Sequence, residues 1–210
     1  IRDREEAEYA VEFSHVGLTY AGAGDESLTD IDFKVKKGET IGIIGGTGSG
    51  KSSVVNLIPR FYDVTSGFIK VDGKDIKDYP LEELRGKIGT VLQKAVLFHG
   101  TIRENLKWGN PDATEEDLNR AITVAQAKEF VDNKEGRLDF EIEQGGKNLS
   151  GGQRQRLTIA RAVVKKPEIL ILDDSASALD FATDAALRKA IREMEGETTV
   201  FIVSQRAASI

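Results

Sequence analysis

Residues 45–52 form the glycine-rich loop that most constrains what this chain can fold into. Their sequence, Gly-Gly-Thr-Gly-Ser-Gly-Lys-Ser, has the spacing G-x-x-x-x-G-K-[ST]. The β-branched run 40–44 predicts a strand before the loop, and residues 52–57 predict the start of a helix after it. Glycines let successive backbone N–H groups point inward at an anion, and the helix dipole favours phosphate. The alternative, a glycine-rich turn that matches by chance, does not explain this strand and helix.

The side chains of this loop complete a predicted phosphate site. Lys51 directs a positive charge toward the outer phosphates, and the Ser52 hydroxyl is placed to bind a magnesium ion. The predicted nucleotide-contacting residues are Gly45, Gly46, Thr47, Gly48, Ser49, Gly50, Lys51, Ser52 and Ser53.

Composition narrows the class of protein. The 210 residues suffice for one large domain with a core, and the net charge of −6 gives no argument for a nucleic-acid partner. The chain has no cysteine, which excludes a disulfide framework and a thiolate metal site and is compatible with a cytosolic setting. No apolar run reaches the roughly 18 residues of a membrane span, and the charged residues 1–8 do not resemble a signal peptide.

Four apolar runs each end at a polar segment, which predicts a common edge. They span residues 41–44, 88–92, 169–172 and 200–203, and they lead into the phosphate loop, Gln93, Asp173-Asp174 and Ser204-Gln205. Continuous apolar runs are typical of strands buried on both faces, so we expect a mainly parallel sheet covered by helices. Ligands bind beyond the carboxyl ends of such strands, where these polar residues converge.

The rest of the chain predicts two additions to this α/β core. Partial alternation in residues 10–20 and 27–35, separated by a turn at 21–24, indicates an antiparallel β layer. Residues 114–130 have helical periodicity, with Thr114 at the helix start. We therefore expect an α/β core with its β subdomain in residues 1–93 and 161–210, and a mainly helical insert in residues 94–160.

The pentapeptide Leu149-Ser-Gly-Gly-Gln153 precedes a helix that runs to about Val164. Ser150 and Gln153 have the spacing of a capping box. Gly151 and Gly152 occupy the first helical turn, where each costs up to about 1 kcal/mol relative to alanine. A simple cap does not require them, whereas a backbone that approaches a phosphate does. Local chemistry favours neither interpretation.

Taken in this order, the phosphate loop, Gln93, the pentapeptide and Asp173 resemble the nucleotide-binding domain of an ATP-binding cassette (ABC) transporter. Residues 149–153 match the family signature, and residues 57–67 and 97–106 are similar to the exporter branch. The resemblance implies a P-loop NTPase fold that binds ATP with Mg²⁺. It also implies a head-to-tail dimer, in which each ATP lies between one phosphate loop and the other domain's signature. Transmembrane domains would hold the assembly at the cytoplasmic face of the cell membrane.

The resemblance assigns four further roles by position. Tyr20 matches the aromatic residue that stacks on adenine, although a tyrosine at a strand end also serves plain packing. Gln93 matches the glutamine that reaches magnesium and the attacking water. Without the resemblance, it could be a surface residue at the end of a strand. Asp173 matches the carboxylate that holds magnesium through water, or else caps a helix. Asp180 matches the loop that signals across the dimer, and a helix N-cap explains it equally well.

Three positions depart from the family pattern. Asp174 stands where the family has the glutamate that orients the attacking water, and Gln205 stands where it has a histidine at the γ-phosphate. Gln144 replaces a glutamate that exporters usually carry before the signature. The first two departures suggest a site that binds ATP and hydrolyses it slowly, as in the degenerate half of a heterodimeric exporter. The alternative is a homodimer in which aspartate suffices.

Other classes remain alternatives at this point. A soluble ABC ATPase would act without a membrane, and a nucleotide-sensing module would bind ATP without turnover. A kinase is disfavoured because the pentapeptide has no role there. Since the family continues beyond the position of Gln205 with more strands and a helix, we expect the C-terminal end of the usual domain to be absent from this sequence.

Overall fold

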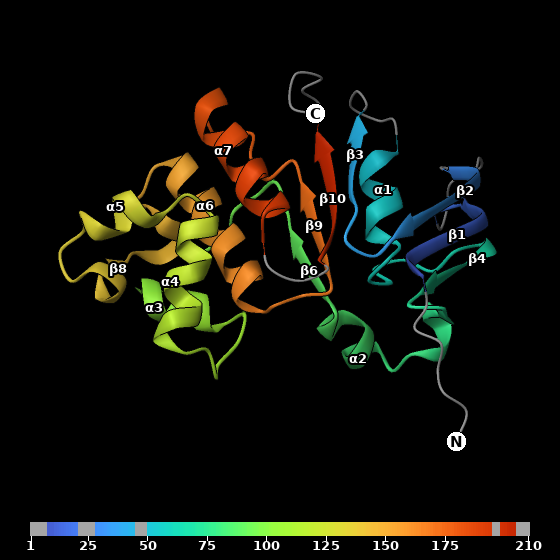
Figure 1. Ribbon diagram of the computed structural model, residues 1–210, viewed down its shortest axis with the longest axis horizontal. Coiled ribbons are helices and arrows are strands. Elements are labelled where there is room, and N and C mark those ends of the chain that lie inside the picture. Colours follow the sequence, from blue (N-terminus) through green and yellow to red (C-terminus); the bar gives the residue numbers. More distant parts are fainter. Residues whose placement is uncertain (1–7, 21–27, 45–49, 195–197, 205–210) are drawn as a thin grey trace.

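The computed structural model describes residues 8–20, 28–44, 50–194 and 198–204 (Figure 1). The strands are β1 (Tyr9–Leu18), β2 (Leu28–Lys36), β3 (Thr40–Ile44), β4 (Ser66–Val71), β5 (Lys74–Asp75), β6 (Ile88–Val91), β7 (Gly100–Thr101), β8 (Glu141–Ile142), β9 (Ile169–Asp173) and β10 (Thr199–Ser204). The helices are α1 (Lys51–Asn56), α2 (Leu81–Gly86), α3 (Ile102–Lys107), α4 (Glu115–Val124), α5 (Lys128–Asp132), α6 (Gly151–Val164) and α7 (Phe181–Arg192), with 3-10 turns at Ile76–Asp78, Arg137–Asp139 and Gln144–Gly146. Within these ranges, no helix has the length and apolar character needed to cross a bilayer.

The predicted parallel sheet is confirmed. Its order is β3-β10-β9-β6, and all three pairings are parallel. In β9, Ile169 and Ile171 pack into the core under the antiparallel layer, whereas Leu170 and Leu172 pack into the core under the helices. Because successive side chains of a strand point to opposite faces, a strand buried on both faces has a continuous apolar sequence.

Strand β3 departs from the expected burial on both faces. Its residues alternate between partly buried and exposed, and Ile44 is 51% exposed. Among the described strands β3 lies at the edge of the sheet and pairs with β10 on one side. The apolar sequence of this strand predicted its existence correctly but not its position in the sheet.

The antiparallel layer is also confirmed, in the order β2-β1-β4-β5. Strands β1 and β2 correspond to the two predicted segments, and Phe13 stacks on Phe33 across them with ring centroids 4.3 Å apart. The turn expected at residues 21–24 lies outside the described residues. Strand β4 was not anticipated from the sequence, although it pairs with β1 and buries Ile69 and Val71.

Helices α3, α4, α5 and α6 follow β6 and precede β9 (Figure 1). The single helix expected over residues 114–130 is two helices. Thr114 caps α4 as predicted, but Gln126 has φ 60°, and the Ala127 N–H donates to the Ile122 carbonyl over 2.8 Å. A left-handed residue followed by this backward hydrogen bond ends a helix, and α5 starts anew after it.

Close packing of α3 against α6 yields a stability prediction. A Cβ atom built at Gly109, just after α3, would lie 2.1 Å from the Arg161 carbonyl oxygen of α6. We expect Gly109→Ala to lower the free energy of unfolding by about 1–3 kcal/mol, because the backbone must move apart. Gly86→Ala is the matched control, since its Cβ meets nothing within 4 Å. Urea denaturation measures both variants, and equal stabilities for them would contradict the packing argument.

Candidate functional site

Strand registers bring the carboxyl ends of the parallel sheet to one edge. Ser204 of β10 lies opposite Ile44 of β3, and Val203 lies opposite Asp173 of β9. Val91, the last residue of β6, lies opposite Leu172. Figure 1 shows the arrowheads of β3 and β10 pointing to the same end of the sheet. The carboxyl ends of the four strands therefore lie side by side.

The end of the phosphate loop lies at this edge. Residues 45–49 are outside the described residues, and the description resumes at Gly50, which has φ 82° and precedes α1. Lys51 is only 9% exposed, and the Ser52 hydroxyl donates a hydrogen bond of 3.0 Å to Asp173 Oδ1. The structure thus brings Lys51 and Ser52 together with Asp173, which lies 121 positions after Ser52 in the sequence.

Burial shapes the electrostatics of Asp173. Its side chain is enclosed at the end of β9, and this burial raises the pKa of Asp173 above the usual aspartate value. The Ser52 hydrogen bond and the Lys51 charge act in the opposite direction, while the Asp174 carboxylate adds to the rise. Because burial disfavours the ionised form of this carboxylate, a cation next to it would stabilise that form.

Asp174 continues from β9 in an unusual backbone conformation. It has φ 53°, and its N–H donates to the Val203 carbonyl oxygen over 2.9 Å. Left-handed backbone at a residue other than glycine costs free energy, and it occurs where the surrounding structure fixes it. Gln205, the other residue expected at the outer phosphate, lies outside the described residues.

Tyr20 and Ser53 also meet. The Tyr20 hydroxyl shares a hydrogen bond with Ser53 Oγ, so the segment just after β1 is joined to the first turn of α1. Gln93 follows β6 and is exposed. Gln144 lies in the 3-10 turn before the signature.

The pentapeptide forms the N-terminus of α6, as predicted. The Gln153 N–H donates to Ser150 Oγ over 3.1 Å, and the Ser150 N–H donates to Gln153 Oε1 over the same distance. The structure adds a reason for the glycines: a Cβ at Gly152 would lie 3.2 Å from the Ala178 carbonyl oxygen. Close packing against the 177–180 loop is therefore a third explanation for the glycines, beside helix capping and the close approach of a phosphate.

Two helices at the site lie on opposite faces of the parallel sheet. Val55 of α1 packs with the antiparallel layer, whereas Leu157 and Ile159 of α6 pack with the helical part. Figure 1 shows α1 and α6 on either side of β9 and β10. The signature helix and the helix that begins at Lys51 therefore cover different faces of the sheet.

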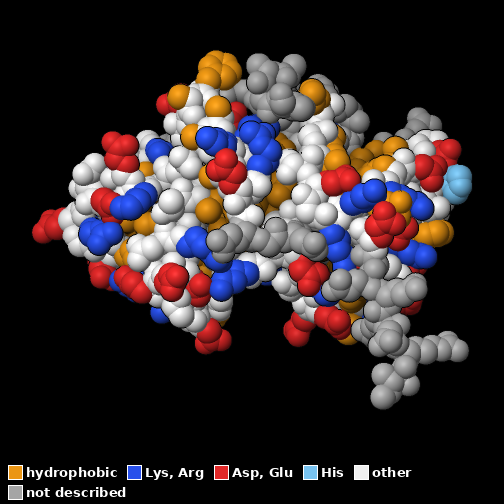
Figure 2. Space-filling view, viewed as in Figure 1, with side chains coloured by type: hydrophobic (Ala, Val, Ile, Leu, Met, Phe, Trp, Pro, Cys, Tyr) orange, Lys and Arg blue, Asp and Glu red, His pale blue; other side chains and the backbone are white. Residues whose placement is uncertain are grey.

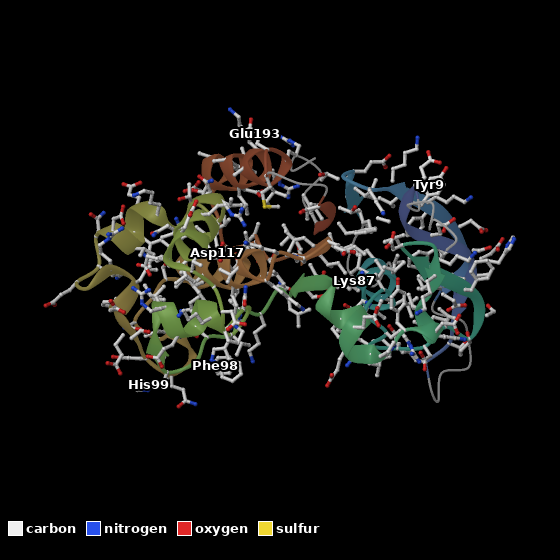
Figure 3. The ribbon with its side chains drawn as sticks, turned by 60° about the horizontal axis from the view of Figure 1, so that its bottom comes forward. Tyr9, Lys87, Phe98, His99, Asp117 and Glu193 are labelled. Carbon is white, nitrogen blue, oxygen red and sulfur yellow. The ribbon has the colours of Figure 1, made fainter. Side chains whose placement is uncertain are left out.

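A cavity lined by described residues lies away from this edge. It has a volume of about 1150 Å³ and includes Ile169 and Thr199, the first residues of β9 and β10. Side chains of both charges line this cavity, among them Lys87 and Glu193, which are labelled in Figure 3. Figure 2 shows that basic and acidic side chains are also interspersed over the surface of the molecule. Ligands of such sheets bind beyond the carboxyl ends of the strands, so a cavity of mixed charge at their amino ends does not identify a phosphate site.

A family model described as ABC transporter matches residues 28–177. The chain belongs to the ABC transporter family. It is 43% identical over 208 residues to the "Beta-(1-->2)glucan export ATP-binding/permease protein NdvA" of Rhodopseudomonas palustris, a match that covers 99% of this chain and 34% of that protein. It is 44% identical over 200 residues to the "Uncharacterized ABC transporter ATP-binding protein YwjA" of Bacillus subtilis, covering 95% of this chain and 35% of that protein.

A solved structure agrees with these relatives. A bacterial Atm1-family ABC exporter with ATP bound superposes with a TM-score of 0.89 at 34% sequence identity, covering 95% of this chain and 35% of that chain. This chain thus spans about a third of the length of the proteins that it matches. It has the fold of an ABC ATP-binding domain of the exporter type, and this confirms the predicted P-loop NTPase fold with its antiparallel β layer.

In this ABC domain, Gln155 is a buried polar residue next to the signature that the sequence patterns did not single out. It is 5% exposed on α6; its amide donates to Ser177 Oγ over 3.0 Å, and its Oε1 accepts from the Ala178 N–H over 2.8 Å. A polar residue on the buried face of a helix was the available signal. The same loop ends at Asp180, whose carboxylate caps α7 by accepting from the Thr183 N–H over 2.7 Å, which lowers the pKa of Asp180.

The raised pKa of Asp173 predicts a pH-dependent stability. An aspartate whose pKa is higher in the folded state destabilises the fold when ionised; the cost is absent below the usual value of about 3.9 and complete above the raised one. Asp173→Asn removes the charge and keeps an acceptor for Ser52. Without magnesium, we expect the variant to have the larger free energy of unfolding at about pH 7, and the difference to shrink as the pH falls to about 4.

Urea denaturation at both pH values measures this difference. Asp112→Asn, at an exposed turn position, is the control for the loss of one negative charge. A variant of Asp173 that is less stable than wild type at both pH values would show that burial does not disfavour the carboxylate.

Proposed function

We propose that this chain is the ATP-binding and ATP-hydrolysing domain of an ABC exporter. The observation that carries this proposal is the hydrogen bond between Ser52 and Asp173 beside the buried Lys51, at the end of a phosphate loop. Lys51 binds the outer phosphates, the loop amides surround them, and Tyr20 stacks on the adenine base. The exporter relatives, which join ATP-binding and permease parts in one protein, support the coupling to transport.

The donor atoms at this edge fit a magnesium ion. The Ser52 hydroxyl, the Asp173 carboxylate and the Gln93 amide oxygen are the hard oxygen ligands that Mg²⁺ prefers. The pKa of Asp173, raised by burial, points in the same direction, because a neighbouring cation favours the ionised form. When bound, magnesium neutralises charge on the phosphate oxygens.

We propose that the chain's own site hydrolyses ATP slowly. Asp174 carries the charge of a catalytic carboxylate but is one C–C bond, about 1.5 Å, shorter than glutamate. A displacement of about 1 Å can lower a rate about 10²-fold. Its fixed left-handed backbone limits compensation for the missing length. Gln205 adds to the effect, since an amide hydrogen-bonds to phosphate but carries no titratable proton.

A second nucleotide-binding domain completes the proposed assembly. Since α1 and α6 lie on opposite faces of the sheet, the intact signature of this chain serves the phosphate loop of a partner more readily than its own. Ser150, Gly151, Gly152 and Gln153 then close a competent site in a partner that has glutamate and histidine at the corresponding positions. The chain's own site holds ATP for longer, as a clamp between the two domains.

The helical part carries an exposed apolar surface that supports a membrane partner. Phe98 and Trp108 are 44% and 69% exposed, with ring centroids 5.1 Å apart, and Leu92 and Val96 are also exposed. Asn105 fixes the Phe98 backbone, with its side chain accepting from the Phe98 N–H over 2.9 Å and donating to the Phe98 carbonyl over 3.0 Å. Figure 3 shows Phe98 at the outer edge of the helical part.

Exposed aromatic clusters of this kind mark protein–protein interfaces. We propose that residues 94–160 act as a subdomain that binds the transmembrane domains with this surface, and that residues 1–93 and 161–210 form the ATP-binding core. The chain then works at the cytoplasmic face of the cell membrane.

Binding of Mg-ATP tests the nucleotide site. We expect the folded chain to take up Mg-ATP in calorimetry and Lys51→Ala to abolish most of this uptake, because the variant loses the charge that pairs with the outer phosphates. Lys77→Ala, which removes an exposed lysine near β5, is the control. Uptake that survives Lys51→Ala unchanged would contradict the proposal.

Steady-state ATPase activity of the complex with its partner tests the asymmetry. We expect Asp174→Asn to leave most of the activity, and removal of the partner's catalytic carboxylate to lower it by about 10²-fold or more, because chemistry takes place mainly at the partner's phosphate loop. If Asp174→Asn alone abolishes turnover and the partner variant does not, the assignment of the slow site is wrong.

A further inference from the structure

Tyr20 contacts two other side chains, in addition to its proposed role of stacking on the adenine base. Its hydroxyl hydrogen-bonds to Ser53 of α1, and its ring packs at the border of the core under the antiparallel layer. A second aromatic ring lies against it: the Tyr62 centroid is 5.1 Å from that of Tyr20, and the rings are inclined by 85°. This distance and angle correspond to an edge-to-face aromatic pair.

The turn that carries Tyr62 is joined to the helix that begins at Lys51. The Phe61 N–H donates to the Asn56 carbonyl, at the end of α1, over 3.1 Å. Arg60 and Asp63 form an ion pair of 3.0 Å around the same turn, and the Arg85 guanidinium lies 5.4 Å from the Phe61 ring centroid. Tyr62 is 46% exposed, so burial in the core does not explain its position.

We propose that Tyr62 is a positioning residue for the base of the nucleotide, acting through Tyr20. Ser53 holds the hydroxyl end of Tyr20 and Tyr62 holds its ring, so the plane on which a base stacks is set from two sides. Ser53 lies in the first turn of α1 and Tyr62 lies in the turn that follows this helix, so both supports are tied to the helix that begins at Lys51. This inference rests on the proposed function and concerns a base-bearing triphosphate.

The consequence is a selective effect on affinity. An edge-to-face pair contributes about 0.5–1.5 kcal/mol, which corresponds to a change of about two- to tenfold in a dissociation constant. Tyr62 does not belong to the phosphate-binding residues. The loss of Tyr62 should therefore not change the dissociation constant of a ligand that has phosphates but no base. Inorganic tripolyphosphate with magnesium is such a ligand, and Mg-ATP is its base-bearing counterpart.

Calorimetry with these two probes on the chain and its variants tests the proposal. We expect Tyr62→Leu to weaken Mg-ATP binding about two- to tenfold and to leave Mg-tripolyphosphate binding unchanged. Tyr62→Phe keeps the ring and should bind Mg-ATP like wild type. In a Tyr20→Leu background, Tyr62→Leu should have no further effect, because it acts through Tyr20.

Each contrary result has its own meaning. Equal losses for the two ligands would show that Tyr62 supports the whole site rather than the base, and unchanged Mg-ATP affinity in Tyr62→Leu would show that it positions nothing; either result overturns the inference. Thermal unfolding checks the fold, and Tyr62→Met replaces the leucine variant if that is destabilised. Failure of the wild-type chain to bind either ligand would instead overturn the proposed function.

Discussion

The pairing of β10 with β9 on one side and β3 on the other is the constraint on which the site depends. β10 is buried along its whole length, and its registers place Asp173 beside Val203 and Ile44 beside Ser204. A slip of one residue reverses which side chains face each core, and it would also carry Asp173 away from Ser52. Apolar burial on both faces of the sheet therefore fixes the geometry of the polar residues at its edge.

The same edge carries groups that the fold alone does not favour. Lys51 and Asp173 are each 9% exposed, and Asp174 has left-handed backbone. Buried charges and strained backbone cost free energy unless a partner offsets them. The hydrogen bond from Ser52 offsets part of this cost, and the apolar core supplies the rest of the stability. Such an arrangement is typical of a site selected for a ligand rather than for the stability of the folded chain.

Sequence patterns predicted most of the fold because its strongest signals are local. The runs ending at Asp173 and Ser204 are continuous apolar segments, and the capping box at Ser150 is readable from four residues. The edge position of β3 was not predictable, because burial depends on which strands become neighbours. The helix expected over residues 114–130 ends at Gln126, whose left-handed conformation goes with the backward hydrogen bond of Ala127. Since this position is not a glycine, the sequence did not indicate a left-handed residue there.

Contacts between distant segments explain what was missed at the site. Tyr62 lies beside Tyr20 only because the turn after α1 folds back toward the end of β1, and 42 residues separate the two rings in the sequence. Gln155 shows the same limit on the other face of the sheet: its position on α6 is readable, but its partners in the 177–178 segment are not.

Gln155 also links the signature end of α6 to the loop that follows β9. Its two hydrogen bonds and the close approach of Gly152 to Ala178 join the signature end of α6 to the loop between Asp174 and Asp180. That loop starts at Asp174, next to the proposed phosphate site, and ends at the cap of α7. In the proposed pair of domains, the signature senses the partner's nucleotide while Asp174 lies at the chain's own. If the buried Gln155 amide keeps both of its hydrogen bonds, a displacement of the signature helix would move the 177–178 segment with it, and we expect this motion to extend toward Asp174.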